Sequence, residues 1–573
     1  MRGRIRIAPD KLTFVVPALV VIYLVVPPLG LLILSSVRST QDSLPLEAGP
    51  LTFDNYVHVF TSAETYQLLF NSSLYALAST MLGLVIATGF AWLLERTDIP
   101  ASDHLFTLLL VPMAVPGLIS AIAWALLLNP NNGILNVLMR DLFGLSITRG
   151  PLNIYSIAGM IFVSGLLHVP SILLMISGAF RSFDPAFEEA SEASGVSRLM
   201  SQLRISLPLL RPTLAAAFIY YLVRGMEAFD IPAVLGFGSG LHVFSTKIYL
   251  ATHPFTGLPD YGLASGYSMV LLLLSFVLIA AYRQVAAKQR AFAVVTGKGY
   301  RTTRLRLGNW RYAALGVVSI YLLLAVVLPA LTLIWVSLQP YLDLPTLDSL
   351  SRLTLKNYRG MVEFGLFRTA VANIAIVLVI VATFTMLLST FTAWMAVRRP
   401  FAGSSVPDSL VFIMIAVPGV VTALALMFVY LSVPLPIYGT IWILVIGFST
   451  LYLVYASRLM GGSVIQIHQE LEEASYASGV SSAITFRRIV IPLLMPSFLN
   501  GWLWIATHAM RETALSAMLL TPGNVVPAAL LWNKWTSGGD LPLVAAMSVA
   551  LMGAVVFLTL IGRSFLLRRG LGA

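Results

Sequence analysis

The sequence has no cysteine and few charged side chains, and both absences exclude broad classes of protein. None of its 573 residues is cysteine, which rules out a disulfide framework, a thiolate metal site and a cysteine nucleophile. Charged residues make up 11% of the chain and hydrophobic residues 58%, whereas a soluble domain carries roughly 25% charged residues. The composition therefore predicts a membrane protein that crosses the bilayer several times.

The chain also lacks a phosphate-binding loop of the form G-x4-G-K-[ST], which an ATPase of that class needs. Gly297-Lys298-Gly299 has neither the Ser/Thr nor the upstream glycine, and no such motif stands elsewhere. Clustered His and Asp motifs, which we would expect in a membrane enzyme, are absent too. The sequence therefore predicts a protein that is not an enzyme, with no catalytic residue, no cofactor and no stable metal site.

Long apolar runs fill most of the chain, and a transmembrane helix needs ~20 mostly apolar residues. The fold class we expect is an all-α polytopic membrane protein with two tandem six-helix halves. The first run is longer than the apolar region of a cleaved signal peptide, and no A-x-A-like site follows it, so we interpret it as a retained helix. The twelve candidate spans are 13–37, 68–94, 104–128, 154–180, 213–235, 262–282, 313–337, 368–396, 408–432, 436–460, 497–520 and 542–566.

Positive charge lies beside the apolar runs rather than in one block. The segment 283–311 contains eight Lys and Arg residues and no acid, and both ends of the chain are basic. Lys and Arg in short loops favour the cytoplasmic side, so the N-terminus, the C-terminus and this linker are expected there. The linker's charge fits topology and contact with anionic lipid better than nucleic-acid binding, because the aromatic or groove-reading context is missing.

The two halves repeat in sequence. Leu51-Thr52-Phe53-Asp54-Asn55-Tyr56, Ala91-Trp92 and Val115-Pro116-Gly117 each return 302 residues later, as in Tyr358, Trp394 and Gly419. A second set of matches, such as Gly195 and Gly479, is 284 residues apart. The first half therefore holds 18 extra residues, which we place in the polar stretch 129–151. The expected domains are 1–282, a basic linker 283–311, and 312–573.

A polar motif is written once in each half, between apolar runs. Glu189-Ala190-Ser191 is followed by Gly195 and then by Ile205-Ser206-Leu207-Pro208; Glu473-Ala474-Ser475 is followed by Gly479 and then by Ile489-Val490-Ile491-Pro492. Asp184-Pro185 suits a helix start, the glycine allows a turn, and the prolines interrupt the chain before the next span. Each copy, in 184–212 and 468–496, predicts a helix–turn–helix elbow outside the membrane.

The two elbows resemble the signature loop E-A-A-x3-G-x9-I-x-L-P of permease subunits of bacterial ATP-binding-cassette importers. Ser replaces the second Ala in both copies, and Ile491 replaces Leu in the second. The resemblance implies the type I importer permease fold in the inner membrane, a periplasmic binding protein, and two copies of a separate ATPase subunit. By this resemblance, the residues that mark the ATPase-coupling elbows are Glu189, Ala190, Gly195, Glu473, Ala474 and Gly479.

Ionisable residues stand inside two of the apolar runs, where each costs ~2.5–3.5 kcal/mol and suggests function. Arg224, Glu227 and Asp230 are three residues apart and so lie near one helix face, and Pro232 is expected to break that helix. His508 and Glu512 are four apart, with Arg511 between them. The two groups either line a central pathway or form charge-compensating pairs that fix packing. His168 is expected to be a packed histidine.

A fused pair of six-span halves looks most like the ferric-iron permeases of this superfamily. A hard cation such as ferric iron favours oxygen ligands, and Glu227, Asp230 and Glu512 offer passing contacts. Thiamine, phosphonate and polyamine permeases are the alternatives, and an ion-coupled secondary transporter is a more distant one. The turns at 129–133 and 521–524 are candidates for contact with the binding protein.

Overall fold

The computed structural model describes residues 11–39, 50–181, 186–291, 304–398 and 406–568, and within these ranges helices are the only regular elements apart from two isolated bridges. The helices of the first half are α1 (Lys11–Ser36), α2 (Asp54–Thr61), α3 (Ala63–Arg96), α4 (Ser102–Leu110), α5 (Gly117–Leu128), α6 (Ile134–Phe143), α7 (Ile157–Arg181), α8 (Ala186–Ala193), α9 (Arg198–Ser201), α10 (Leu207–Leu209), α11 (Arg211–Glu227), α12 (Asp230–Gly236), α13 (Phe244–Thr252) and α14 (Tyr261–Ala291).

The second half follows the same plan. Its helices are α15 (Trp310–Leu322), α16 (Leu328–Ser337), α17 (Leu347–Leu350), α18 (Lys356–Glu363), α19 (Gly365–Arg398), α20 (Val406–Ile413), α21 (Gly419–Ser432), α22 (Ile441–Gln466), α23 (Glu470–Ala477), α24 (Ser482–Thr485), α25 (Ile491–Met510), α26 (Ala514–Met518), α27 (Pro527–Thr536) and α28 (Leu541–Arg568).

Among the described residues, nine helices are long and apolar enough to cross a membrane, or eleven if each of two bent pairs counts as one span. The bent pairs are the segments expected at 104–128 and 408–432, whose two parts meet at 89° and 116°. The expected span 213–235 is not one helix either, because α11 ends at Glu227. The expected span 497–520 is broken in the same way, because α25 ends at Met510. An all-α, multi-pass fold with two tandem halves is confirmed, but four of its twelve segments are broken.

The bends arise at the repeated Val-Pro-Gly sequences. Val115 and Val417 are extended, with ψ of 120° and 111°, as the residue before a proline prefers. Each proline is also extended and serves as the N-cap of the next helix, α5 or α21. The sequence therefore ends one helix and starts another in the middle of an apolar run.

The repeat at residues 51–56 has a structural purpose at one end of each half. Asn55 donates its Nδ2 to the carbonyls of Ser36 and Arg38 at 3.2 and 2.8 Å, and Asn357 donates to those of Ser337 and Gln339 at 2.8 and 2.7 Å. Each asparagine thus satisfies carbonyls at the end of the first spanning helix of its half, which that helix leaves unpaired.

The first helix of each half packs against the other half. Helix α1 packs on α19, α20 and α21 of the second half as well as on α14, and the Tyr23 and Tyr430 hydroxyls lie 2.7 Å apart. In turn, the segment from α15 to α16 packs on α4, α5 and α7 of the first half, and the Tyr321 hydroxyl donates to the Leu166 carbonyl at 3.0 Å. Neither half is therefore packed without the other.

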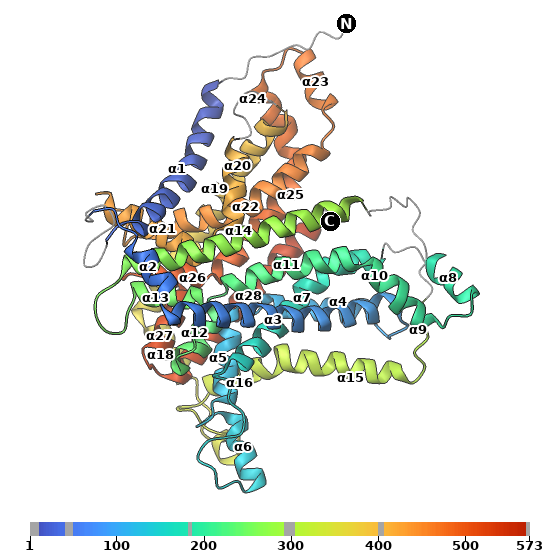
Figure 1. Cartoon of the computed structure of the whole chain (residues 1–573), viewed down its shortest axis with the longest axis vertical. Coiled ribbons are helices and arrows are strands. Elements are labelled where there is room, and N and C mark those ends of the chain that lie inside the picture. The colour runs from blue at the N-terminus through green and yellow to red at the C-terminus, as the bar shows by residue number, and fades with distance from the viewer. Residues whose placement is uncertain (1–10, 40–49, 182–185, 292–303, 399–405, 569–573) are drawn as a thin grey trace.

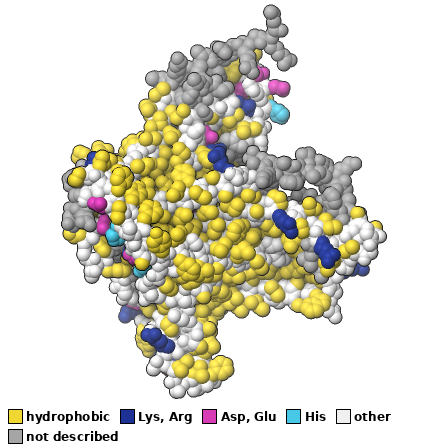
Figure 2. Space-filling model, in the orientation of Figure 1, with side chains coloured by type: hydrophobic (Ala, Val, Ile, Leu, Met, Phe, Trp, Pro, Cys, Tyr) yellow, Lys and Arg dark blue, Asp and Glu magenta, His cyan; other side chains and the backbone are white. Residues whose placement is uncertain are grey.

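Two helical bundles diverge from a common base (Figure 1). Helices α19, α22 and α25 rise toward α23 and α24, while α3, α7 and α11 run to the right toward α8 and α9. The base holds α12, α13, α26 and α27, which come from both halves. Figure 2 shows the face in view covered with hydrophobic side chains and with few charges on it, as a surface in contact with lipid requires.

An additional helix, α6, projects from the first half at the end opposite the elbows (Figure 1). The buried Asn136 anchors it: its Nδ2 donates to three carbonyls, those of Leu128, Asn129 and Leu152, at 2.7–3.1 Å. The second half connects α21 to α22 with only eight residues, 433–440. Helix α6 thus lies in the stretch where the spacing of the repeats places the extra residues.

Candidate functional site

The two elbows have the same backbone. Helices α8 and α23 each end at a glycine in the left-handed region, Gly195 with φ of +83° and Gly479 with φ of +79°. A Cβ on either glycine would meet no heavy atom within 4 Å, so the demand for glycine is conformational: a side-chain-bearing residue pays about 1–2 kcal/mol there. The expected helix start at Asp184-Pro185 lies outside the described residues.

A π-helical segment follows each turn, at Gln202–Ser206 in the first half and at Phe486–Val490 in the second. Each is followed two residues later by a proline, Pro208 or Pro492. Proline has no N–H, and its ring clashes with the carbonyl four residues back in a regular helix; the wider π turn relieves that clash. In the second half Pro492 therefore does not interrupt the chain as expected but continues it with a widened turn. In the first half the helix is interrupted at Leu210, between Pro208 and Pro212.

A hydrogen bond closes each elbow at equivalent positions. The Ser201 hydroxyl donates to the Ser191 hydroxyl at 2.7 Å, and the Ser475 and Thr485 hydroxyls lie 2.8 Å apart. Ser191 and Ser475 are the residues that replace the second alanine of the signature. The substitution thus adds a link between the two arms of each elbow.

A buried ion pair anchors each elbow to its half. Glu188 lies 3.9 Å from Arg96 at the end of α3, and Glu472 lies 3.1 Å from Arg398 at the end of α19. All four side chains are at most 10% exposed. Removing one partner of a buried pair costs about 3–5 kcal/mol, so these carboxylates hold the elbows in place.

The sequence motif points to the neighbouring glutamates and not to these buried pairs. Ala190, Glu473 and Ala474 are exposed at the elbows, and the Glu189 side chain lies outside the described residues. Arg96 and Arg398 are 302 residues apart, and Glu188 and Glu472 are 284 apart, so the two repeat spacings already contained the signal. A role of the exposed residues in ATPase coupling stays a prediction.

The end of the linker contacts the base of the first elbow. Leu305 forms a parallel bridge with Thr97: its N–H donates to the Arg96 carbonyl at 2.8 Å, and its own carbonyl accepts from the Asp98 N–H at 3.0 Å. The Leu307 N–H donates to Asp98 Oδ1 at 2.8 Å. The residues of the linker that precede Arg304 and follow Ala291 lie outside the described ranges.

The intramembrane charges of the two halves come together at the breaks in the helices. A Cβ on Gly117 would lie 3.1 Å from Asp230 Oδ2, and one on Gly419 would lie 3.8 Å from Glu512 Oε1. A carboxylate therefore stands at the N-terminus of α5 in the first half and of α21 in the second, where the helix dipole favours negative charge. Asp230 also interacts with Thr513 and with the charges of Arg511 and Glu512.

One basic residue of this cluster, Arg511, connects the halves. Arg511 donates to the Met113 carbonyl of the first half and, through Nη2, lies 2.8 Å from His508 Nε2. Arg224 pairs with Glu227 at 3.1 Å. No ion pair joins Arg511 directly to Glu512 in the described chain, so the expected compensating pair is formed in the first half alone.

The helices break earlier than the sequence suggested. Asp230 does not continue the face of Arg224 and Glu227, because the chain leaves the helix at Ala228 and Asp230 begins α12. Pro232 lies within the first turn of α12, where its missing N–H is not needed, and so it is not the residue that breaks the run. Likewise α25 ends at Met510, before Glu512.

His168 is packed, as expected. Its ring centroid lies 5.1 Å from that of Tyr221, and its Cβ faces Gly83 of α3 so closely that a Cβ on the glycine would come within 2.8 Å. Within the described ranges, no group of three or more His, Asp or Glu residues is placed to hold a metal ion.

An aromatic cluster from both halves lies beyond the charges, at the base of the two bundles. The buried Trp532 contacts Phe229, Phe237 and Tyr249 with ring centroids 5.5–5.9 Å apart, and its Nε1 donates to the Tyr249 hydroxyl at 3.2 Å. On the far side Phe237 lines a pocket of about 370 Å³, together with Asn129, Asn132, Tyr155, Leu342, Trp535 and others from both halves. Helix α12 leads from Asp230 to this pocket.

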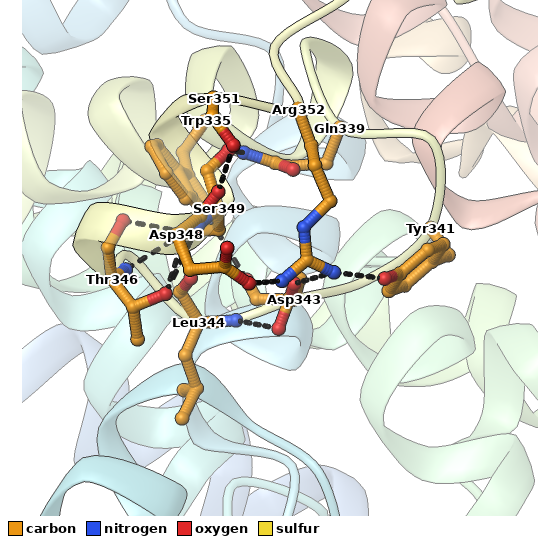
Figure 3. Close-up of polar contacts among 10 residues, drawn as sticks. All are labelled: Trp335, Gln339, Tyr341, Asp343, Leu344, Thr346, Asp348, Ser349, Ser351 and Arg352. Carbon is orange, nitrogen blue, oxygen red and sulfur yellow. Dashed lines mark hydrogen bonds and ion pairs between the residues drawn. The ribbon is translucent and has the colours of Figure 1, made fainter.

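A connected loop of the second half adjoins that pocket. Figure 3 shows Arg352 directed at Tyr341, Asp343 and Asp348, with its Nη1 3.3 Å from Asp343 Oδ2. Thr346 and Ser349 exchange hydrogen bonds of 3.2 and 2.8 Å that cap α17. Leu342, which lines the pocket, is thus held in a loop tied by its own polar contacts. The turn at 521–524 does not line this pocket.

Two fused helical halves with paired elbows, joined around a cluster of charges at the helix breaks, define the membrane permease of an ATP-binding-cassette importer. The chain belongs to the family of binding-protein-dependent transport system inner membrane components, whose pattern it matches twice, at residues 79–291 and 385–568. It is therefore a multi-pass inner-membrane protein that works with a binding protein and an ATPase.

Two ferric transport permeases match most of the chain, and a sugar permease matches less than half of it. A putative ferric transport system permease protein, FbpB 1 of Haemophilus influenzae, is 27% identical over 481 residues, covering 82% of this chain and 71% of its own. The ferric transport system permease protein FbpB of Actinobacillus pleuropneumoniae is 26% identical over 507 residues, 84% and 69% of the two chains. The trehalose/maltose transport system permease protein MalF of Thermococcus litoralis is 28% identical over 232 residues, 39% of this chain and 76% of its own.

Proposed function

We propose that this permease imports ferric iron delivered by a periplasmic binding protein. The resemblance to ferric transport permeases over more than four-fifths of the chain supports this cargo. The observation that carries the proposal within the molecule is the pair of carboxylates, Asp230 and Glu512, at the helix breaks where the halves meet. Oxygen ligands of this kind suit a hard cation.

The path we propose runs from the pocket beside Asn129 and Tyr155, past the aromatic cluster around Trp532, to the charged cluster. In the present conformation the aromatic rings separate the pocket from the charges, while the bundles diverge on the elbow side (Figure 1). This arrangement supports an inward-facing state that is closed to the outside. With two opposing carboxylates and two nearby arginines, the cluster favours transient contact with the cargo over retention.

We further propose that two copies of the ATPase subunit dock on the elbows, one on each, through Glu189, Ala190 and Gly195 and through Glu473, Ala474 and Gly479. Both elbows and both chain termini would then face the cytoplasm, in keeping with the basic segments at the ends and in the linker. ATP-driven closure of the two ATPase subunits would bring the elbows together and open the aromatic cluster. ATP hydrolysis would reside entirely in the partner subunits.

The test is ATPase activity of the complete transporter in liposomes. We would co-express the chain with its ATPase and binding protein and add binding protein loaded with ferric iron, thiamine, a phosphonate or a polyamine in turn. Stimulation by the ferric form supports the proposal. Stimulation by another cargo alone would overturn the assignment of iron but leave the ATP-driven import mechanism in place. Transport without any associated ATPase would overturn the coupling scheme in favour of a secondary transporter.

The carboxylates give a second readout. Asp230→Asn and Glu512→Gln are expected to lower iron uptake roughly 10-fold or more each, equivalent to about 1.4 kcal/mol of lost transition-state stabilisation. Binding-protein docking and ATPase association should persist, because neither residue lies at a surface those partners reach. Glu363→Gln, outside the cluster at the end of α18, is the matched control. Unchanged uptake in both variants would remove the carboxylates from the pathway.

A further inference from the structure

A cavity of about 290 Å³ lies at the base of the first elbow. Helix α3 forms one wall with Thr88, Gly89, Trp92 and Arg96, and the elbow and α7 form the rest with Phe180, Gln202, Ser206 and Leu207. The neighbouring elements thus enclose an apolar space with polar groups gathered toward one end. Its volume lies at the lower edge of the range of small-ligand pockets, roughly 300–1,000 Å³.

The corresponding place in the second half is filled by aromatic rings. Phe391 stands where the first half has Gly89, and Phe486 stands where it has Gln202. These two rings pack with centroids 5.9 Å apart, and Phe486 lies 4.7 Å from Trp394, the counterpart of Trp92. In the first half a Cβ on Gly89 would meet no heavy atom within 4 Å. The cavity therefore exists because two aromatic side chains are missing.

The polar end of the cavity carries an unsatisfied donor. Trp92 Nε1 donates to Gln202 Oε1 at 2.8 Å, which fixes the orientation of the amide. The amide Nε2 of Gln202 is then turned away from the indole. It has no hydrogen-bond partner among the described residues, although Gln202 is only 3% exposed. A buried donor without a partner costs about 1–3 kcal/mol, so an occupant with a carbonyl oxygen would be favoured here.

The apolar end opens toward lipid. Gly89 is exposed, and the exposed residues one and two turns deeper on α3 are Val85 and Met81, at 64% and 47%. Helix α3 is one of the apolar helices long enough to span the membrane. Seven residues of helix separate Gly89 from Arg96, or about 10 Å of rise, so the donor end lies nearer the elbow than the opening does.

We propose that this cavity binds one acyl chain of a membrane phospholipid, with the ester carbonyl accepting a hydrogen bond from Gln202 Nε2. The chain enters past Gly89 from the bilayer and fills the space that Phe391 and Phe486 occupy in the other half. Only the first elbow then rests on a lipid, whereas the second rests on its own side chains. This inference does not depend on the identity of the cargo.

Tryptophan quenching by brominated lipid tests the proposal on the full chain with its ATPase in nanodiscs. The Trp92 signal is the difference between the wild type and Trp92→Phe, and the Trp394 signal is obtained with Trp394→Phe. With phosphatidylglycerol brominated on its acyl chains, we expect the Trp92 signal to be quenched and the Trp394 signal to be spared. Equal quenching of the two signals, or none at Trp92, would overturn the proposal.

Filling the cavity supplies the matched control. Gly89→Phe should abolish the quenching of Trp92, and Gln202→Phe should do the same if the first variant does not fold. The reciprocal change, Phe391→Gly, should make Trp394 sensitive to the brominated lipid. Quenching that persists in a folded variant with the cavity filled contradicts the assignment, and quenching by a free brominated fatty acid alone contradicts the phospholipid ester.

Discussion

The bases of the two elbows share one backbone but differ in the side chains that support it. In the second half Glu472 accepts from Trp394 at 3.1 Å and pairs with Arg398, which also donates to the Val464 carbonyl at 2.9 Å. In the first half the Trp92 indole donates to Gln202 instead. Glu188 lies 3.9 Å from Arg96 and accepts a hydrogen bond from the Ser206 hydroxyl. The second elbow is thus tied by direct contacts to α19 and, through Arg398, to α22, whereas the first elbow borders a cavity.

The comparison shows that the duplicated halves retain the residues that the backbone conformation of the elbow requires, whereas the side chains packed around the elbow differ. The left-handed glycines, the π turns and the arginine–glutamate pairs are present twice. The packing around them is not, so the two elbows are expected to respond differently to the same substitution of a packed side chain and alike at the turn glycines. The linker adds to the asymmetry, because Leu305 is bound to the Arg96 carbonyl and so contacts the first elbow's anchor.

The largest effect is expected from the buried glutamates. Glu472→Gln should destabilise the second elbow by about 3–5 kcal/mol, because Arg398 would be left as an uncompensated buried charge. Glu188→Gln should cost less, since its arginine lies farther away and its other partner is a hydroxyl. Hydrogen exchange of the elbow amides measures both.

The exposed neighbour Glu473→Gln is the control for that comparison and should leave elbow exchange unchanged while weakening ATPase association. Equal destabilisation by Glu188→Gln and Glu472→Gln would show that the two anchors are equivalent despite their different geometry.

An intermediate effect is expected at the turn glycines. Gly195→Ala and Gly479→Ala should each strain the elbow by about 1–2 kcal/mol, because both glycines are left-handed. Asn tolerates that conformation better than Ala, so Gly195→Asn and Gly479→Asn should retain more of the ATPase stimulation by loaded binding protein. Since φ differs by only a few degrees between the halves, the two sites should respond alike; a loss confined to one elbow would mean that only that elbow couples.

The smallest effect is expected from exchanging side chains between the elbows. Gln202→Phe removes the bond to Trp92, worth about 1 kcal/mol, and adds an aromatic contact of similar value, so its thermal stability should be nearly that of the wild type. Phe486→Gln loses the aromatic contacts of Phe391 and Trp394 and should be about 1 kcal/mol less stable. Comparable losses in thermal unfolding of the two purified variants would contradict the asymmetry.

Much of the architecture follows from local sequence. The twelve apolar runs, the two repeat spacings and the glycine turns were all visible because they depend on composition, period and backbone conformation at single positions. The extra residues of the first half were also placed correctly, since Asn136 and its surroundings form a compact helix in the stretch that the spacing indicated. The bends at Val115-Pro116 and Val417-Pro418 were present in the repeated motif but were not interpreted as breaks.

The candidate site was visible in part. The six ionisable residues of the membrane interior were evident from the sequence, but their arrangement was not: Asp230 was expected on the helix of Arg224 and belongs to the next one. The buried anchors were missed because a glutamate next to the signature looks like its exposed neighbours until its distant arginine partner, Arg96 or Arg398, is known.

What the sequence by itself determined is the class: a long apolar, duplicated chain with two polar elbows and no ATP-binding motif. These properties are fixed by residue chemistry and short-range spacing. Only the tertiary structure decided which glutamate is buried, that each half's first helix packs on the other half, that the charged breaks meet between the halves, and that one elbow rests on a cavity while the other rests on aromatic rings. Those outcomes depend on side chains distant in sequence competing for the same space, which no local pattern encodes.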